Sequence, residues 1–191
     1  MTPSFVSTFI IMQSFEEKVK QALYHLLLQR EEVDERLPEA VDIEQLWPKL
    51  GEAYIPDGIR EFERYPTVSL GWMMYVGMAV AAFWDEDWVF YSQFDNLYFF
   101  MRDKGGYDLM DEYIRGTVLK LKQPEYDATE SLAQDCAEMV HNLLRHEGFE
   151  PGTEAAFRGY VSCLHQLYLM GAAVQLHRMG YHMCKMDPNL N

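Results

Sequence analysis

The sequence predicts an all-α fold, in which residues 1–191 form a single domain of about six or seven helices. Three observations predict it. Apolar residues recur at helical spacing along most of the chain. Residues 68–84 are apolar on every side, which is typical of a central helix enclosed by other helices. Short turns separate the helical segments, without a polar linker or an internal repeat, so we expect one multi-helix bundle.

The first helix is predicted from its start signal. Residues 14–17 (Ser-Phe-Glu-Glu) fit a capping box, in which the Ser hydroxyl and the second Glu each satisfy a free backbone amide. The helix should therefore begin at Ser14 and end before Pro38. Residues 1–13 would then form an N-terminal extension, and either Met1 or Met12 could be the natural start.

The next segments carry similar signals. A shorter helix should begin at Asp42 with the same type of cap, and residues 56–58 (Pro-Asp-Gly) should break the chain after it. Within 68–84, Gly77 and Ala81 fall on one small-residue face at about 100° per residue. We expect these two residues to let another helix pack closely against the central one.

The second half of the chain is expected to contain four more helices. Asp85 should cap the first of them, with Phe90 and Phe94 on its inward face. The last helix should open at Thr153 and reach as far as Lys185. The four predicted ranges are 86–103, 107–122, 125–147 and 153–185.

Composition argues against several classes of partner and indicates a cellular location. Sixteen basic and thirty acidic residues leave a formal charge of −14, so neither a nucleic acid nor an anionic membrane surface is an expected partner. The apolar run 68–84 is shorter than the ~20 residues that a membrane span needs. Three cysteines without a CxxC motif suit a reducing compartment, and the N-terminus lacks the features of a secretory signal. We expect a cytoplasmic protein.

Motifs of catalysis and metal binding give no positive signal. Residues 138–141 contain one Glu-x-x-His motif, whereas a carboxylate-bridged di-iron site needs two such motifs and two further Glu residues. His165, His177 and His182 project in different directions from a single helix at about 100° per residue. We therefore expect no metal and no cofactor. The acidic runs 31–35 and 85–87 are interpreted as helix caps and solvated faces.

One candidate site stands out on the last helix. Its predicted inward stripe is apolar up to Gly171 and then continues as Gln175, Arg178 and His182. Buried polar groups need partners, so these three residues are predicted to bind a ligand or a partner, unless the helix has simply outrun the core. Arg178 should hold a carboxylate in two-point contact. That carboxylate would belong to an internal acid, such as one of Asp85–Asp87, or to a ligand.

Two functions follow as expectations. The acidic surface, the many aromatic residues and the absence of catalytic motifs favour a non-enzymatic protein-interaction module, which could also self-associate into a homo-oligomer. The alternative is a small-molecule or enzymatic site between helices, near the C-terminal end of the last helix. A concave pocket beside Arg178 would favour the alternative, and a flat apolar surface would favour the interaction module.

Overall fold

Seven α-helices account for most of residues 5–183, the part of the chain that the computed structural model describes; side chains are described from residue 10 onward. A 3₁₀ turn at Tyr107–Leu109 and a π-helical turn at Ile114–Val118 flank the fifth helix. The described residues contain no strand, which confirms the all-α prediction. The helices are α1 Phe5–Gln29, α2 Val41–Phe62, α3 Pro66–Tyr91, α4 Leu97–Arg102, α5 Met110–Tyr113, α6 Glu125–His146 and α7 Glu154–Arg178.

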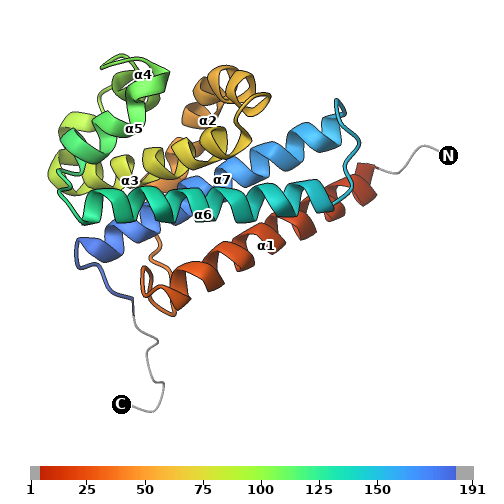
Figure 1. Ribbon diagram of the computed structural model, residues 1–191, viewed down its shortest axis with the longest axis horizontal. Coiled ribbons are helices and arrows are strands. Elements are labelled where there is room, and N and C mark those ends of the chain that lie inside the picture. Colours follow the sequence, from red (N-terminus) through yellow and green to blue (C-terminus); the bar gives the residue numbers. More distant parts are fainter. Residues whose placement is uncertain (1–4, 184–191) are drawn as a thin grey trace, which may run out of the picture.

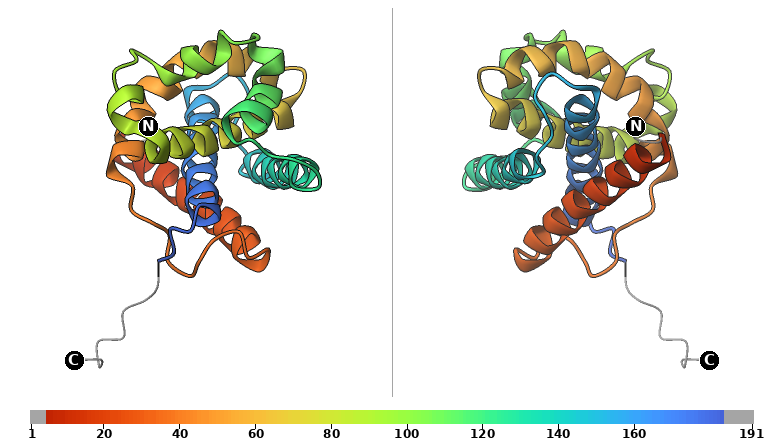
Figure 2. Two further views of the ribbon diagram at one scale, coloured as in Figure 1. Left: turned by 90° about the vertical axis from the view of Figure 1, so that its left-hand side faces the viewer. Right: turned by 90° about the vertical axis from the view of Figure 1, so that its right-hand side faces the viewer.

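Helix α3 is the central element of the bundle, as predicted. It packs against α2, α6 and most extensively α7, while the short helices α4 and α5 cover it at one end. In Figure 2, α7 runs through the middle of the molecule, and α1, α2, α3 and α6 surround it. Figure 1 shows α6 lying along one side of α7 and α1 crossing below both. Two long apolar helices therefore share the core, and the others bury their inner faces on them.

Glycines set the distance between α3 and α7. A Cβ atom added to Gly77 would lie 2.0 Å from the carbonyl oxygen of Tyr168, and one added to Gly171 would lie 2.1 Å from that of Met74. Each helix thus presents a glycine to the backbone of the other. The prediction that Gly77 permits close packing is confirmed, and Ala81 is fully buried as expected.

The first two helices differ from their predicted boundaries. Helix α1 begins at Phe5, so Ser14 is an exposed residue inside it and not a cap. Helix α2 begins after Ala40 without a side-chain cap and continues through Pro48 and Pro56. Both prolines lie on the exposed face of α2, where a disrupted backbone hydrogen bond can be satisfied by water. The predicted break at 56–58 is therefore wrong, because burial of the opposite face outweighs the local signal.

The end of α3 also differs from the prediction. The helix continues to Tyr91 across a non-helical residue, Asp87, whose carboxylate accepts a hydrogen bond from the Phe90 amide at 3.0 Å. The cap thus lies at Asp87 and not at Asp85. Phe90 and Phe94, expected to face inward, are 51% and 37% exposed. The predicted helices 86–103 and 107–122 are replaced by the end of α3 and by shorter helical pieces.

Helix α3 is long enough, at 26 residues, and apolar enough to cross a membrane by length and composition. It exceeds the predicted run because it extends beyond Trp84. However, 72% of its most apolar 18-residue window is buried against the rest of the protein, as in the core helix of a soluble bundle. That the chain has no membrane span stays a prediction that this burial favours.

Helix α7 begins as predicted and ends earlier than predicted. The Thr153 hydroxyl caps it by accepting a hydrogen bond from the Ala156 amide at 3.3 Å. The helix ends at Arg178, and Gly180 follows with a φ of +93°, a left-handed conformation that glycine adopts readily. His182 therefore lies beyond the helix. Lys185, the predicted limit, is outside the described residues.

Candidate functional site

Arg178 makes the two-point carboxylate contact that the sequence predicted, and its partner is internal. Its Nε and Nη2 atoms donate to the two carboxylate oxygens of Glu32 at 2.9 and 2.8 Å, and its Nη1 atom donates to the Thr129 hydroxyl at 2.8 Å. Glu32 lies in the α1–α2 loop and Thr129 on α6. The partner is thus not in the Asp85–Asp87 cluster. Arg178 links α7 to the α1–α2 loop and to α6, and each of its three nitrogen atoms already donates a hydrogen bond within the protein.

Gln175 lies one turn before Arg178 on α7 and is partly buried. Its Oε1 atom is buried and accepts no hydrogen bond from the described part of the chain. The predicted trio does not form one polar surface, because Arg178 binds Glu32 while His182 lies beyond the end of the helix. Each residue therefore has a separate environment.

His182 instead meets His177 and an acidic residue that the sequence analysis assigned to solvent. The Nδ1 atom of His182 lies 3.1 Å from Oδ2 of Asp34, and Nε2 of His177 lies 3.3 Å from Oδ1 of the same carboxylate. The two rings are perpendicular, with their centroids 4.7 Å apart. The expectation that these histidines diverge is wrong, because the chain turns at Gly180 and returns His182 toward the α1–α2 loop.

The net electrostatic effect on Asp34 favours its charged form. Partial desolvation raises the pKa of this carboxyl. The hydrogen bonds from the Met183 amide and from His182, together with the charges of both histidines, lower the pKa by more than desolvation raises it. The Met183 amide donates to Oδ2 at 3.0 Å. Asp34 is thus an ionised acceptor that binds the segment following α7.

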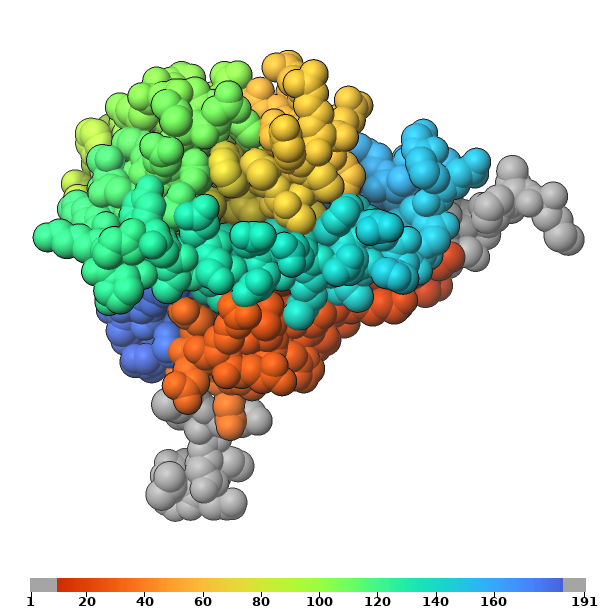
Figure 3. Space-filling model, viewed as in Figure 1, coloured from red at the N-terminus to blue at the C-terminus, as the bar shows by residue number. Residues whose placement is uncertain are grey.

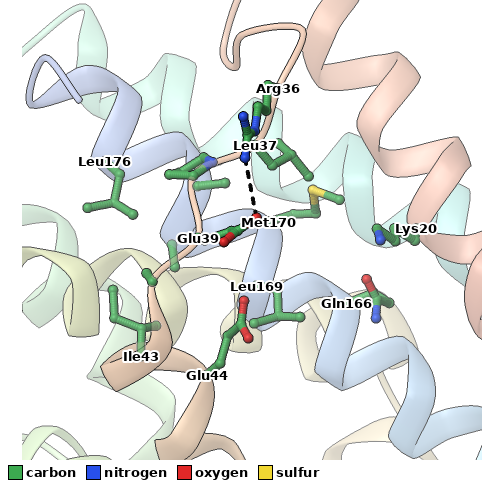
Figure 4. A pocket seen from close by; sticks show the side chains of 14 residues that line it. Lys20, Arg36, Leu37, Glu39, Ile43, Glu44, Gln166, Leu169, Met170 and Leu176 are labelled. Atoms are coloured by element: carbon green, nitrogen blue, oxygen red, sulfur yellow. Dashed lines mark hydrogen bonds and ion pairs between the residues drawn. The ribbon is translucent and has the colours of Figure 1, made fainter. Parts of the chain in front are cut away.

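A cavity of about 300 Å³ lies beside this region, between α1, the α1–α2 loop and α7 (Figure 4). Its wall combines apolar side chains such as Leu169 and Leu176 with Lys20, Glu44 and Gln166. The Nε2 atom of Gln166 donates to Glu16 at 2.8 Å, which fixes the orientation of the amide, since an ionised carboxylate only accepts. The buried Oε1 atom of Gln166 then accepts no hydrogen bond from any described residue.

A larger hollow lies at the opposite end of α7, and we call it the α2–α7 groove. It measures about 710 Å³ and is lined by the end of α2, the end of α6, the α6–α7 turn and the start of α7. In Figure 3 the outline of the molecule is notched between the end of α2 and the α6–α7 turn. The lining is mainly apolar and comprises Ile59, Phe62, Glu63, His141, Leu144, Arg145, Phe149, Pro151, Gly152, Thr153, Ala156, Phe157 and Tyr160.

The Glu-x-x-His motif does not form a ligand pair. Glu138 is exposed and accepts a hydrogen bond from Gln134 at 3.0 Å. His141 is partly buried in the α2–α7 groove, where its ring lies perpendicular to the ring of Phe62, with the two centroids 5.9 Å apart. Burial first, and then the charge of Arg145, lower the pKa of His141, so its neutral form is favoured.

The cysteines within the described residues are core residues. Cys136 and Cys163 are fully buried and unpaired, and burial raises the pKa of the Cys136 thiol to about 12. Burial likewise raises the pKa of Cys163. Neither thiol is activated as a nucleophile, because burial disfavours the thiolate form. Cys184 lies outside the described residues.

Comparison of the chain with protein-family models, with curated proteins and with solved structures finds no match. The site residues therefore rest on geometry alone. Sequence reasoning missed Glu32 and Asp34, because an acidic run at the end of a helix is usually solvated. The available signal was Val33, an apolar residue inside that run, which is 3% exposed and anchors the loop so that both neighbours meet α7.

Proposed function

We propose that this protein is a non-enzymatic, cytoplasmic protein-interaction module, whose α2–α7 groove binds an amphipathic helix of a basic partner protein. The observation that carries the proposal is the groove itself, a mainly apolar hollow of about 710 Å³ at one end of the bundle. Large apolar side chains remain exposed in it: Ile59 is 37% and Phe157 is 43% exposed. Contiguous exposed apolar surface of this kind is typical of interaction sites.

The shape and lining of the groove suit a helix. Three helices and a turn line it, and Phe62, Phe149 and Leu144 supply apolar surface on which the apolar face of a partner helix would bury its side chains. Glu63 and Arg145 at the edge supply one charge of each sign for the partner's polar flanks. The lining contains no cysteine or serine and a single acidic residue, Glu63, so the groove favours binding over catalysis.

Charge decides which partner is favoured. The chain carries a formal charge of −14, so its field attracts a basic partner and accelerates encounter at low salt. The same field repels a second copy of the chain. Self-association through this groove is therefore the less favoured version of an interaction function.

The test uses selection of displayed helical peptides on the purified full chain. We expect enrichment of amphipathic peptides with basic flanks, which bind the wild-type protein but not Phe157→Asp. Phe99→Asp is the matched control, because Phe99 is equally exposed, at 43%, on α4 and outside the groove. Both substitutions are on exposed side chains, and circular dichroism would verify that both variants fold.

Three results would contradict the proposal. The first is equal binding of the selected peptides to Phe157→Asp and wild type, and the second is selection of peptides without basic flanks. The third is a concentration-dependent dimer that Phe157→Asp abolishes and Phe99→Asp does not, which would assign the groove to a second copy of the chain.

The second candidate function is small-molecule binding in the cavity of Figure 4. The observation that favours it is the buried Oε1 atom of Gln166, which accepts no hydrogen bond from the described residues. Gln166 is only 5% exposed, and the cavity that it lines also has charged side chains in its wall. A ligand with a hydrogen-bond donor would satisfy this atom. Ligand-observed NMR of a fragment library should then show binding to wild type that Gln166→Leu removes; fragments that bind both proteins equally would refute it.

A further inference from the structure

Contacts from Tyr181 and Met183 help to hold the segment after α7 against the bundle. The Tyr181 hydroxyl donates to Asp85, the Tyr181 ring meets Trp84 edge-on at 5.6 Å, and the Met183 amide donates to Asp34. The turn at Gly180 makes this return possible. As a result His177, in the last turn of the helix, and His182, beyond its end, face the same carboxylate.

Donor atoms of three side chains lie close enough together to hold a metal ion after a local rearrangement. One donor atom from each of Asp34, His177 and His182 lies within 4.8 Å of the other two, and the two nearest nitrogen-to-oxygen distances are 3.1 and 3.3 Å. Donors at ~2.0–2.1 Å from a tetrahedral metal ion are roughly 3.4 Å apart. We propose that Asp34, His177 and His182 form a binding site for a divalent transition-metal ion, with Zn²⁺ as the probe of choice.

Ligand chemistry selects the class of metal. Two imidazole nitrogens and one carboxylate suit Zn²⁺, Ni²⁺, Co²⁺ and Cu²⁺, whereas Mg²⁺ and Ca²⁺ prefer oxygen ligands. Three protein ligands leave a fourth position for water or an external donor. The carboxylate of Asp34 would have to exchange its hydrogen bonds to the two rings for bonds to the metal, a local rearrangement of three side chains.

The surroundings favour a cation. His182 is 55% exposed on its side chain, which leaves a path from solvent. The neighbouring positive charge of Arg178 is compensated by its two-point contact with Glu32. The formal charge of −14 raises the local concentration of cations around the whole chain. These conditions are independent of the α2–α7 groove, which lies at the other end of α7.

Metal binding would tie distant parts of the chain together. Asp34 and His182 are separated by 148 positions, so an ion between them links the α1–α2 loop to the segment after α7. An ion that binds only the folded state stabilises that state by mass action. The melting temperature should therefore rise with the concentration of Zn²⁺.

The experiment uses the full chain without an affinity tag, treated with a chelator and then titrated with Zn²⁺ in a calorimeter. We expect one ion per chain and a Co²⁺ derivative with visible absorption bands. His182→Ala should weaken Zn²⁺ binding about 100-fold or more, since even the loss of residues that merely support ligands costs 10–100-fold. His146→Ala is the matched control, because His146 is an exposed histidine at the end of α6, where its Nδ1 atom lies 2.6 Å from the carbonyl oxygen of Asn142.

The proposal is overturned if Zn²⁺ does not bind, if His182→Ala binds as tightly as wild type, or if His146→Ala weakens binding equally. Because the side chain of His182 is more than half exposed, this variant is expected to fold, and circular dichroism checks it. Asp34→Asn provides the second variant, and it should lose the Zn²⁺-dependent rise in melting temperature while keeping the helical spectrum.

Discussion

Substituting Gly77 by Ala tests the closeness of the α3–α7 crossing directly. The added Cβ atom would lie 2.0 Å from the carbonyl oxygen of Tyr168, whereas ordinary van der Waals contact begins at 3.4 Å. The position of a Cβ atom is fixed by the helix backbone and the contacted oxygen is a backbone carbonyl, so the clash cannot be relieved by rotating a side chain. The helices would have to move apart to relieve it, and their interface contains much of the core.

The magnitude is a balance of two effects. Overpacking a core costs ~1–3 kcal/mol and occasionally more, and backbone-to-backbone overlap of this size belongs at the upper end. Replacing Gly by Ala within a helix recovers ~0.5–1 kcal/mol of conformational entropy. We therefore expect Gly77→Ala to lower the free energy of unfolding by about 2 kcal/mol or more, which corresponds to ~4–8 °C in melting temperature for a chain of this length.

The assay is urea unfolding followed by far-UV circular dichroism. Gly71→Ala is the matched control, because Gly71 is also buried on α3 but an added Cβ would have its nearest neighbour at an ordinary 3.7 Å. The control should be neutral or slightly stabilised. A Gly77→Ala variant within ~0.5 kcal/mol of wild type, the range usual for surface positions, would refute the close crossing.

Two further predictions concern ion pairs. Arg178→Ala should lower the free energy of unfolding by ~1–3 kcal/mol, because it leaves the partly buried Glu32 without its partner. Arg158→Ala removes an exposed ion pair and should change the free energy of unfolding by less than ~0.5 kcal/mol. Equal effects of the two substitutions in urea unfolding would show that the Arg178 contact contributes no more than an exposed ion pair. The hydrogen bond from His165 holds the pKa of Glu16 below its ordinary value. The stabilisation by Glu16 is therefore complete above its unfolded-state pKa of ~4.3 and is lost as the pH falls through the folded-state pKa. The difference in the free energy of unfolding between wild type and Glu16→Gln should then shrink on acidification. A difference that stays constant down to acid unfolding would contradict this prediction.

The candidate site was predictable in part. The end of the apolar stripe on α7 correctly pointed to Arg178 and to its two-point carboxylate contact, since a charged group near a core needs a partner. The identity of the partner was not predictable, because Glu32 is separated from Arg178 by 146 positions. The prediction that His182 points away from His177 was wrong because it placed His182 on a helix that continues past Gly180. A single residue in the left-handed conformation changed which side chains meet.

The sequence by itself determined the helical class, the enclosed position of α3 and the small-residue contact at Gly77. These properties follow from spacing and volume along the chain, and any bundle of these helices must satisfy them. Only the tertiary structure decided that α2 passes through two prolines, that Phe90 faces outward and that Asp34 meets two histidines. Each of these depends on the free energy of packing between segments distant in sequence, which outweighs local signals of ~1 kcal/mol such as caps and which no local pattern records.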